Sequence, residues 1–178
     1  MSFIRAIQEL GGQSVSLCFQ CSKCSAGCPL ADKMDLKPAQ IMHNICLGRD
    51  EVVLNSRAIW LCVGCETCSA RCPQQVEPAA VMAAARALAL QKGIQPRVRE
   101  VGIYYQGFVY NMRLNGKIHD ASVAAITHLL TGQPFADMPL IWKLLIRGRL
   151  KPPPLPTGGA KFRKLYQNAL ARERAVSL

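Results

Sequence analysis

The sequence lacks the features that identify membrane-spanning and secreted proteins. A membrane helix needs about 20 consecutive apolar residues, and the best candidate, 76–90, is interrupted by Glu77 and Arg86. The first residues, MSFIRAIQEL, have no basic head followed by a long apolar core, so they do not resemble a signal peptide. We therefore expect a soluble protein of the cytoplasm.

Motifs for nucleotide binding and for substrate chemistry are absent as well. There is no G-x-G-x-x-G, so nothing predicts a dinucleotide or flavin site in this chain. There is also no adjacent pair of cysteines and no plausible pairing of a nucleophile with a base. We therefore expect no catalytic residue in the chain.

Charge is distributed unevenly along the 178 residues. Residues 1–96 contain nine basic and seven acidic side chains, whereas residues 97–178 contain thirteen basic and four acidic ones. Aromatic residues make up only 6%, and few of them stand between basic residues, which disfavours nucleic-acid binding. We expect the basic C-terminal side chains to form a solvated helix face or to dock on a protein partner. They include Lys161, Arg163, Lys164, Arg172 and Arg174.

Cysteine is the residue that the sequence has in excess, with nine copies. In a reducing compartment such cysteines are more often metal ligands than disulfides. Eight of them belong to a duplicated motif: CFQCSKCSAGCP begins at Cys18, and CVGCETCSARCP begins at Cys62. Seven of the twelve positions are identical, and the copies are 44 residues apart. The chain therefore contains a repeated local motif.

Each copy has the form C-x2-C-x2-C-x3-C-P, which is the spacing of two-cluster ferredoxins. Three cysteines of a copy converge on one four-iron cluster, and the fourth ligates the other cluster. Zinc is the alternative, but a third cysteine two residues after a pair has no place in a closed tetrahedral site. The sequence thus predicts two 4Fe-4S clusters. The first is assigned Cys18, Cys21, Cys24 and Cys72, and the second Cys62, Cys65, Cys68 and Cys28.

The remaining pattern is helical and contains no convincing strand, so we expect an all-α fold. The two motifs are separated by enough residues for a helix, which indicates a helical two-cluster domain with additional C-terminal helices. We expect a helical ferredoxin domain over 1–95, a helical extension over 96–150, and a proline-rich linker with a basic helix over 151–178. Helices are predicted at 2–10, 36–47, 78–92, 97–114, 121–131, 138–147 and 161–175.

Four further residues could ligate a metal, but their surroundings favour other roles. Cys46 lies on the apolar face of the helix predicted at 36–47, which is typical of a packed thiol. His43, His119 and His128 have no partner at ligand spacing. We expect structural or surface positions for all three histidines.

The charges among the cysteines differ between the motifs. Lys23 and Arg71 adjoin cysteines that we assign to the first cluster, whereas Glu66 lies between two cysteines of the second. A positive charge favours the reduced form of a cluster, because reduction adds negative charge. The sequence therefore predicts the higher potential for the first cluster.

The paired motifs and the stretch CPQQVEPAAVMAAARALALQKG resemble the C-type subunit of heterodisulfide reductases. The resemblance covers about residues 1–120. It implies an electron relay between a flavin-containing, A-type subunit and a cysteine-rich, B-type subunit that handles a disulfide. The chain would then be an oxidoreductase subunit without a substrate-converting site of its own. A free ferredoxin-like carrier and a cluster-bearing nucleic-acid-binding protein are alternatives, and peripheral membrane association stays open.

Overall fold

The structure is a computed structural model that describes residues 2–11, 15–132, 142–144, 146–148 and 159–176. The regular elements of these residues are helices without exception, which confirms the predicted all-α class. Within the same residues, no helix combines the length and apolar character that crossing a membrane requires. The chain divides into two units, Met1–Arg99 and Glu100–Leu178. The predicted boundaries at 95 and 150 stay predictions.

The first unit combines three longer helices with several helices of one turn. The longer helices are α1 (Phe3–Gly11), α3 (Pro38–Cys46) and α7 (Pro78–Gln91), and they confirm the helices predicted at 2–10, 36–47 and 78–92. The short ones are η1 (Val15–Leu17), α2 (Lys23–Ala26), η2 (Ala31–Lys33), α4 (Asp50–Leu54), α5 (Ala58–Leu61) and α6 (Thr67–Ala70). These were not predicted, because one turn is too short to show a helical period.

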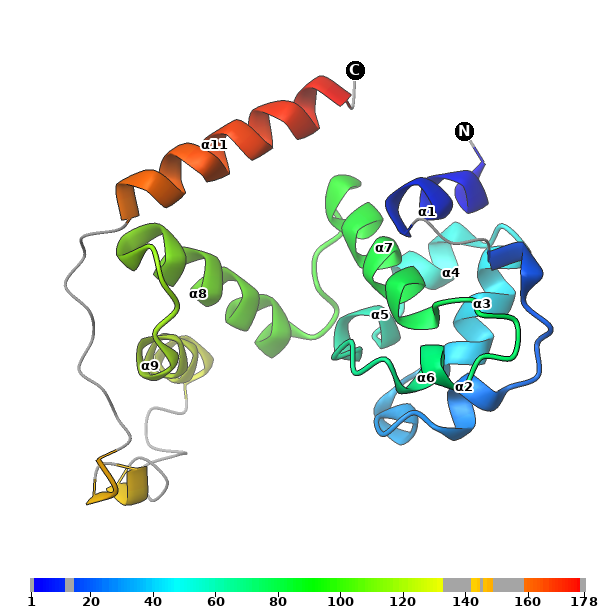
Figure 1. Cartoon of the computed structure of the whole chain (residues 1–178), viewed down its shortest axis with the longest axis horizontal. Coiled ribbons are helices and arrows are strands. Elements are labelled where there is room, and N and C mark those ends of the chain that lie inside the picture. Colours follow the sequence, from blue (N-terminus) through cyan, green and yellow to red (C-terminus); the bar gives the residue numbers. More distant parts are fainter. Residues whose placement is uncertain (1, 12–14, 133–141, 145, 149–158, 177–178) are drawn as a thin grey trace. The chain divides into compact units, whose positions relative to one another are not determined.

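The core of the first unit is mainly aliphatic and surrounds α7. Val81, Met82 and Ala85 of α7 are buried together with side chains of α1, α3, α4 and α5. Burying one such large side chain stabilises the fold by about 1.5–3 kcal/mol. The helix α1 packs against α7 at close range (Figure 1), since a Cβ built on Gly11 would lie 3.3 Å from the Cβ of Ala84. Small residues on both helices permit this approach.

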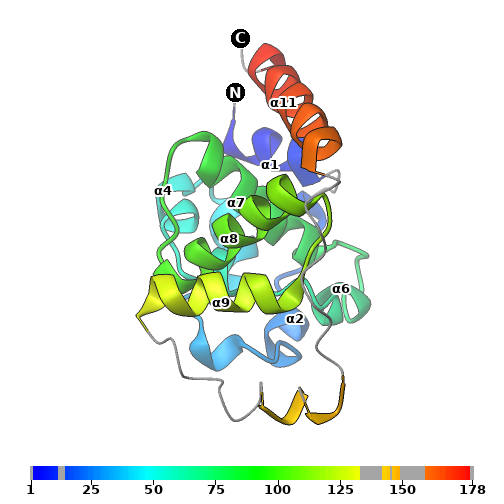
Figure 2. The same cartoon turned by 90° about the vertical axis from the view of Figure 1, so that its left-hand side faces the viewer.

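The second unit contains α9 (Asp120–Thr131), α11 (Gly159–Val176) and all of α8 (Arg99–Asn115) except its first residue. The helix α9 crosses α8 at a steep angle (Figures 1 and 2). Its start is fixed by Asn111 of α8, which is 1% exposed and donates to the hydroxyl of Ser122 at 2.8 Å. Helices at 97–114, 121–131 and 161–175 are thereby confirmed. Half of the helix predicted at 138–147, and almost all of the proline-rich linker, lies outside the described residues.

Candidate metal centre

The duplicated sequence folds into a duplicated backbone. In each motif a short helix, α2 or α6, begins at the residue directly before the third cysteine. Two residues that precede this helix adopt positive φ angles. These are Gln20 (55°) and Ser22 (60°) in the first motif, and Gly64 (63°) and Glu66 (59°) in the second. A non-glycine residue in this conformation costs about 1 kcal/mol. The left-handed turns bend each loop so that its first three cysteines face one space.

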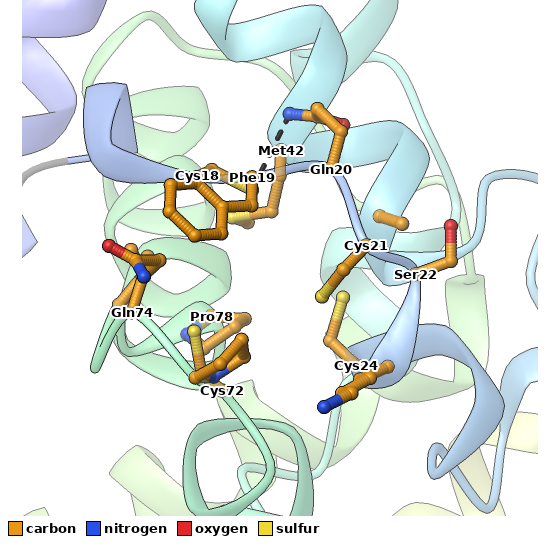
Figure 3. Close-up of a pocket in the computed structure, with 14 residues that line it drawn as sticks. Cys18, Phe19, Gln20, Cys21, Ser22, Cys24, Met42, Cys72, Gln74 and Pro78 are labelled. Atoms are coloured by element: carbon orange, nitrogen blue, oxygen red, sulfur yellow. Dashed lines mark hydrogen bonds between the residues drawn. The ribbon is translucent and has the colours of Figure 1, made fainter.

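The first pocket is lined by Cys18, Cys21 and Cys24 of the first motif and by Cys72 of the second. Figure 3 shows the sulfur atoms of Cys21, Cys24 and Cys72 turned toward the same space, with Phe19 at its edge. Most of the other lining side chains are apolar, among them Met42 and Val76 of the core. The amide of Gln20 donates to the sulfur of Cys18 at 3.4 Å.

The second pocket repeats this composition with the motifs exchanged. It is lined by Cys62, Cys65 and Cys68 of the second motif and by Cys28 of the first. The rest of its lining is apolar apart from Thr67, and it includes Met34, Pro38 and Met82. Each pocket therefore collects four thiols, of which three come from one motif and one from the other.

The contact between α2 and α6 holds the two pockets together. At this contact the side chain of Arg71 lies against Gly27, its equivalent in the other motif. A Cβ built on Gly27 would lie 2.7 Å from the Cδ of Arg71 and 2.9 Å from its Nη1. A Cβ at position 27 would overlap the Arg71 side chain in its present position. Glycine is therefore the residue that fits opposite the arginine.

The short helix α5 positions Cys62, which follows it directly. The carboxylate of Asp35 accepts hydrogen bonds from the backbone N–H groups of Arg57 (2.7 Å) and Ala58 (2.9 Å) at the start of the helix. At its end, Arg86 of α7 donates from Nε to the carbonyl of Ile59 (2.8 Å) and from Nη2 to the carbonyl of Cys62 (2.7 Å). Sequence reasoning missed both residues, since neither belongs to a motif.

Burial opposes ionisation of several pocket thiols. Removal from water raises the pKa of Cys24 and of Cys62, and it raises the pKa of Cys68 to about 11, with the neighbouring Cys62 as a second cause. The charge of Arg86 acts in the opposite direction on the pKa of Cys62. Cys65 is exposed, and its hydrogen bond with the Thr67 hydroxyl lowers its pKa. Buried thiols of this kind become thiolates when a cation compensates their charge.

The donor set fits a cluster better than a single ion. Among the described residues, no three His, Cys, Asp or Glu side chains converge closely enough to hold one metal ion. Four thiols spaced around a cavity instead suit a cube whose irons each take one thiolate. In addition, the hydroxyl of Ser69, next to Cys68, is buried and has no hydrogen-bond partner in the described part of the chain. A bound anionic group would give such a donor a partner.

The ninth cysteine and the three histidines are not among the residues that line the two pockets. Cys46 is half-buried against the core, and its thiol donates to the carbonyl of Val15 at 3.6 Å. His119 caps α9 by accepting from the N–H of Ser122. His43 is exposed on α3. Neither pocket is lined by Cys46, His43, His119 or His128.

Known proteins with similar sequences agree with this chemistry. Residues 17–77 match the family described as "4Fe-4S dicluster domain". Over 92 residues the chain is 37% identical to the C subunit of the ferredoxin:CoB-CoM heterodisulfide reductase of Methanosarcina acetivorans. The match covers 52% of this chain and 36% of that protein, so the chain spans about a third of the relative's length. The chain thus contains a dicluster domain for two 4Fe-4S clusters, and over half its length it is similar to the C-type subunit of a heterodisulfide reductase.

Proposed function

We propose that the chain relays electrons through two clusters held in a crossed arrangement, as one component of a heterodisulfide reductase-like complex. Cys18, Cys21, Cys24 and Cys72 would ligate the first cluster, and Cys62, Cys65, Cys68 and Cys28 the second. The observation that supports this assignment is the lining of the two pockets, in which every motif cysteine occurs once. When bound, a four-iron cluster supplies one-electron chemistry at a potential set by its surroundings.

The residues around the thiols have defined tasks in this proposal. The apolar side chains of each pocket exclude water, which strengthens the interaction of the thiolates with a bound cation. The apolar side chains at the two mouths, Phe19 in the first pocket and Val63 in the second, are 70% exposed and contribute little to this exclusion. The chain has no substrate site in this proposal, so electrons enter and leave through partner proteins.

The partners that we propose are a flavin-containing protein and a cysteine-rich protein that handles a disulfide. This part of the proposal rests on the similarity to a component of a reductase. We also propose that the protein lies in the cytoplasm. A tagged copy purified from its natural host without oxygen should bring both proteins with it. A chain that arrives alone would be a free carrier, and one that arrives with absorbance at 260 nm would be a nucleic-acid binder.

The exposed cations of α11 (Gly159–Val176) are candidate docking contacts for an acidic partner. The described cations of this helix that are exposed are Lys161, Arg163, Lys164 and Arg172. Charges at the edge of an interface act mainly on association rate and on its salt dependence. Replacing these four by glutamine should slow assembly at low salt and leave the cluster spectra unchanged. Assembly at an unchanged rate at low and high salt would refute this surface.

Metal content tests the central claim. After purification without oxygen, the chain should contain about eight irons and about eight acid-labile sulfides, as two cubes require. The protein should be brown, and its visible absorbance should bleach on reduction with dithionite. A colourless protein with stoichiometric zinc would refute the proposal.

A further inference from the structure

The helix that precedes Cys62 is held at both ends by charged side chains from distant parts of the chain. One turn of helix, Ala58–Leu61, is not stable on its own. Asp35 binds the N–H groups at its start, and the guanidinium of Arg86 binds the carbonyls of Ile59 and Cys62 at its end. In this position Arg86 satisfies carbonyls that a helix end leaves without partners, and its charge complements the helix dipole.

Arg86 also brings a permanent positive charge to one of the cysteines of the second pocket. Arginine stays protonated throughout the accessible pH range, and one of its hydrogen bonds reaches the backbone of Cys62 at 2.7 Å. The lining of the second pocket contains no cation, whereas the lining of the first contains Lys23. Arg86 does not line the second pocket, but among the described residues it is a cation that hydrogen-bonds to one of the pocket's cysteines.

The opposing charge in the same motif is more weakly placed. Glu66 lies between Cys65 and Cys68, but its side chain is exposed and does not line the pocket. Water and salt screen an exposed charge more than a half-buried one, and Arg86 is half-buried. The balance of the two charges at the second pocket should thus be positive.

We propose that Arg86 raises the reduction potential of the second cluster, acting as a positioning residue through Cys62. The inference rests on the proposed ligand assignment. Reduction adds one electron to the cluster, taken from the reductant of the titration, and neither forms nor breaks a bond. The added negative charge is stabilised by a nearby cation, so the second cluster is easier to reduce with Arg86 in place than without it.

A redox titration monitored by EPR tests this inference, with the first cluster as the internal reference. In Arg86→Gln the equilibrium constant for reducing the second cluster should fall about tenfold, which corresponds to 59 mV for a one-electron couple. The equilibrium constant for reducing the first cluster should change by less than about twofold, because the interaction between charges weakens with distance. Arg86→Lys keeps the charge and should recover most of the loss.

Asp35→Asn is the matched control for a purely structural role. It loosens the other end of the same helix and leaves the guanidinium in place. If Asp35→Asn lowers the second potential as much as Arg86→Gln does, or if Arg86→Gln lowers only the thermal midpoint, Arg86 is a helix cap and the inference is wrong. If the first cluster moves more than the second, Cys62 belongs to the other cluster, and the ligand assignment fails while the presence of two clusters stands.

Should Arg86→Gln not retain its second cluster, Arg86→His continues the test. A histidine at this position is charged at low pH and neutral at high pH, with an ordinary pKa near 6.5. The potential of the second cluster should then fall as the pH rises through this range, whereas that of the wild type should not. A potential of the second cluster that does not change with pH in this variant would overturn the inference.

Discussion

The two motifs share a backbone but not their surroundings. Their loops place positive φ angles at equivalent positions, Gln20 with Gly64 and Ser22 with Glu66. The equivalent serines, however, differ: Ser25 accepts a hydrogen bond from the N–H of Ala39 at 2.9 Å, whereas the hydroxyl oxygen of Ser69 is buried without a hydrogen-bond partner in the described part of the chain. A repeated sequence thus determines where the thiols lie, and the helices packed around each loop determine the environment that the thiols experience.

The largest expected effect comes from replacing the fourth cysteine of a motif. Cys72→Ala changes the second motif but removes a thiol from the first pocket. We expect the first cluster to be lost or converted and the second to keep its EPR signal, because a missing ligand weakens the site to which it belongs. Iron analysis should show roughly half the wild-type content.

Cys28→Ala is the mirror experiment, and it should spare the first cluster. The thiol of Cys28 lines the second pocket although it belongs to the first motif. If each substitution instead removed the cluster of its own motif, the ligand sets would not be crossed. The two EPR signals are first assigned with the variant Glu66→Gln. The signal whose potential rises in this variant is expected to belong to the second cluster.

Replacing the equivalent serines, Ser25 and Ser69, should lower the thermal midpoint by different amounts. Ser25, in the short helix α2, caps the start of α3, and loss of such a cap costs about 1 kcal/mol. Ser25→Ala should therefore lower the thermal midpoint, measured without oxygen, by about 4–8 °C for a unit of this size. Ser69→Ala should lower it less, because the hydroxyl of Ser69, unlike that of Ser25, caps no helix of the described chain. Equal shifts would show that the two hydroxyls have the same role.

A smaller effect is expected where the equivalent residues Gly27 and Arg71 meet. Gly27→Ala adds a Cβ that overlaps the end of the Arg71 side chain. The flexible Arg71 side chain can move away, so we expect the free energy of unfolding to fall by about 0.5–1 kcal/mol, within the usual range for single substitutions. The double variant with Arg71→Ala should lose less than the sum of the single variants, since the overlap is then absent. Additive losses in chemical denaturation would contradict the contact.

The smallest effect is expected at the exposed positions beside the first cysteines. Phe19 and Val63 are each 70% exposed, and substitutions at such sites usually change stability by less than about 0.5 kcal/mol. Phe19→Ser and Val63→Ser should therefore leave unfolding and both potentials nearly unchanged. Loss of either cluster would mean that the side chain shields its pocket from water.

The sequence predicts the cysteines and the long helices of this fold because both have local signals. The motif spacing selects the thiols that line the two pockets, although their ligation stays a proposal. The short helix α5 has no periodic pattern, and its supports Asp35 and Arg86 lie 23 and 27 residues from the groups they bind. Contacts of this kind depend on tertiary packing, which a motif does not encode.

Arg71 shows the same limit for electrostatics. Its position beside Cys72 assigns its charge to the first cluster, but in the structure its side chain lies against Gly27, the neighbour of Cys28 in the second pocket. Together with Arg86, this weakens the basis for expecting the higher potential in the first cluster. The charge pattern along a chain is therefore a poor guide to potentials when side chains reach across a contact between motifs.

The shared lining of the pockets bears on how such a domain could originate. One copy of the motif supplies three thiols to one pocket and a single thiol to the other, so an isolated copy completes neither. Two copies are the smallest number that closes both, whether they lie on one polypeptide or on two identical ones. A short peptide with a single motif could thus have begun as a symmetric pair, and gene duplication with fusion would then have freed each half to diverge, as Gly27 and Arg71 have done.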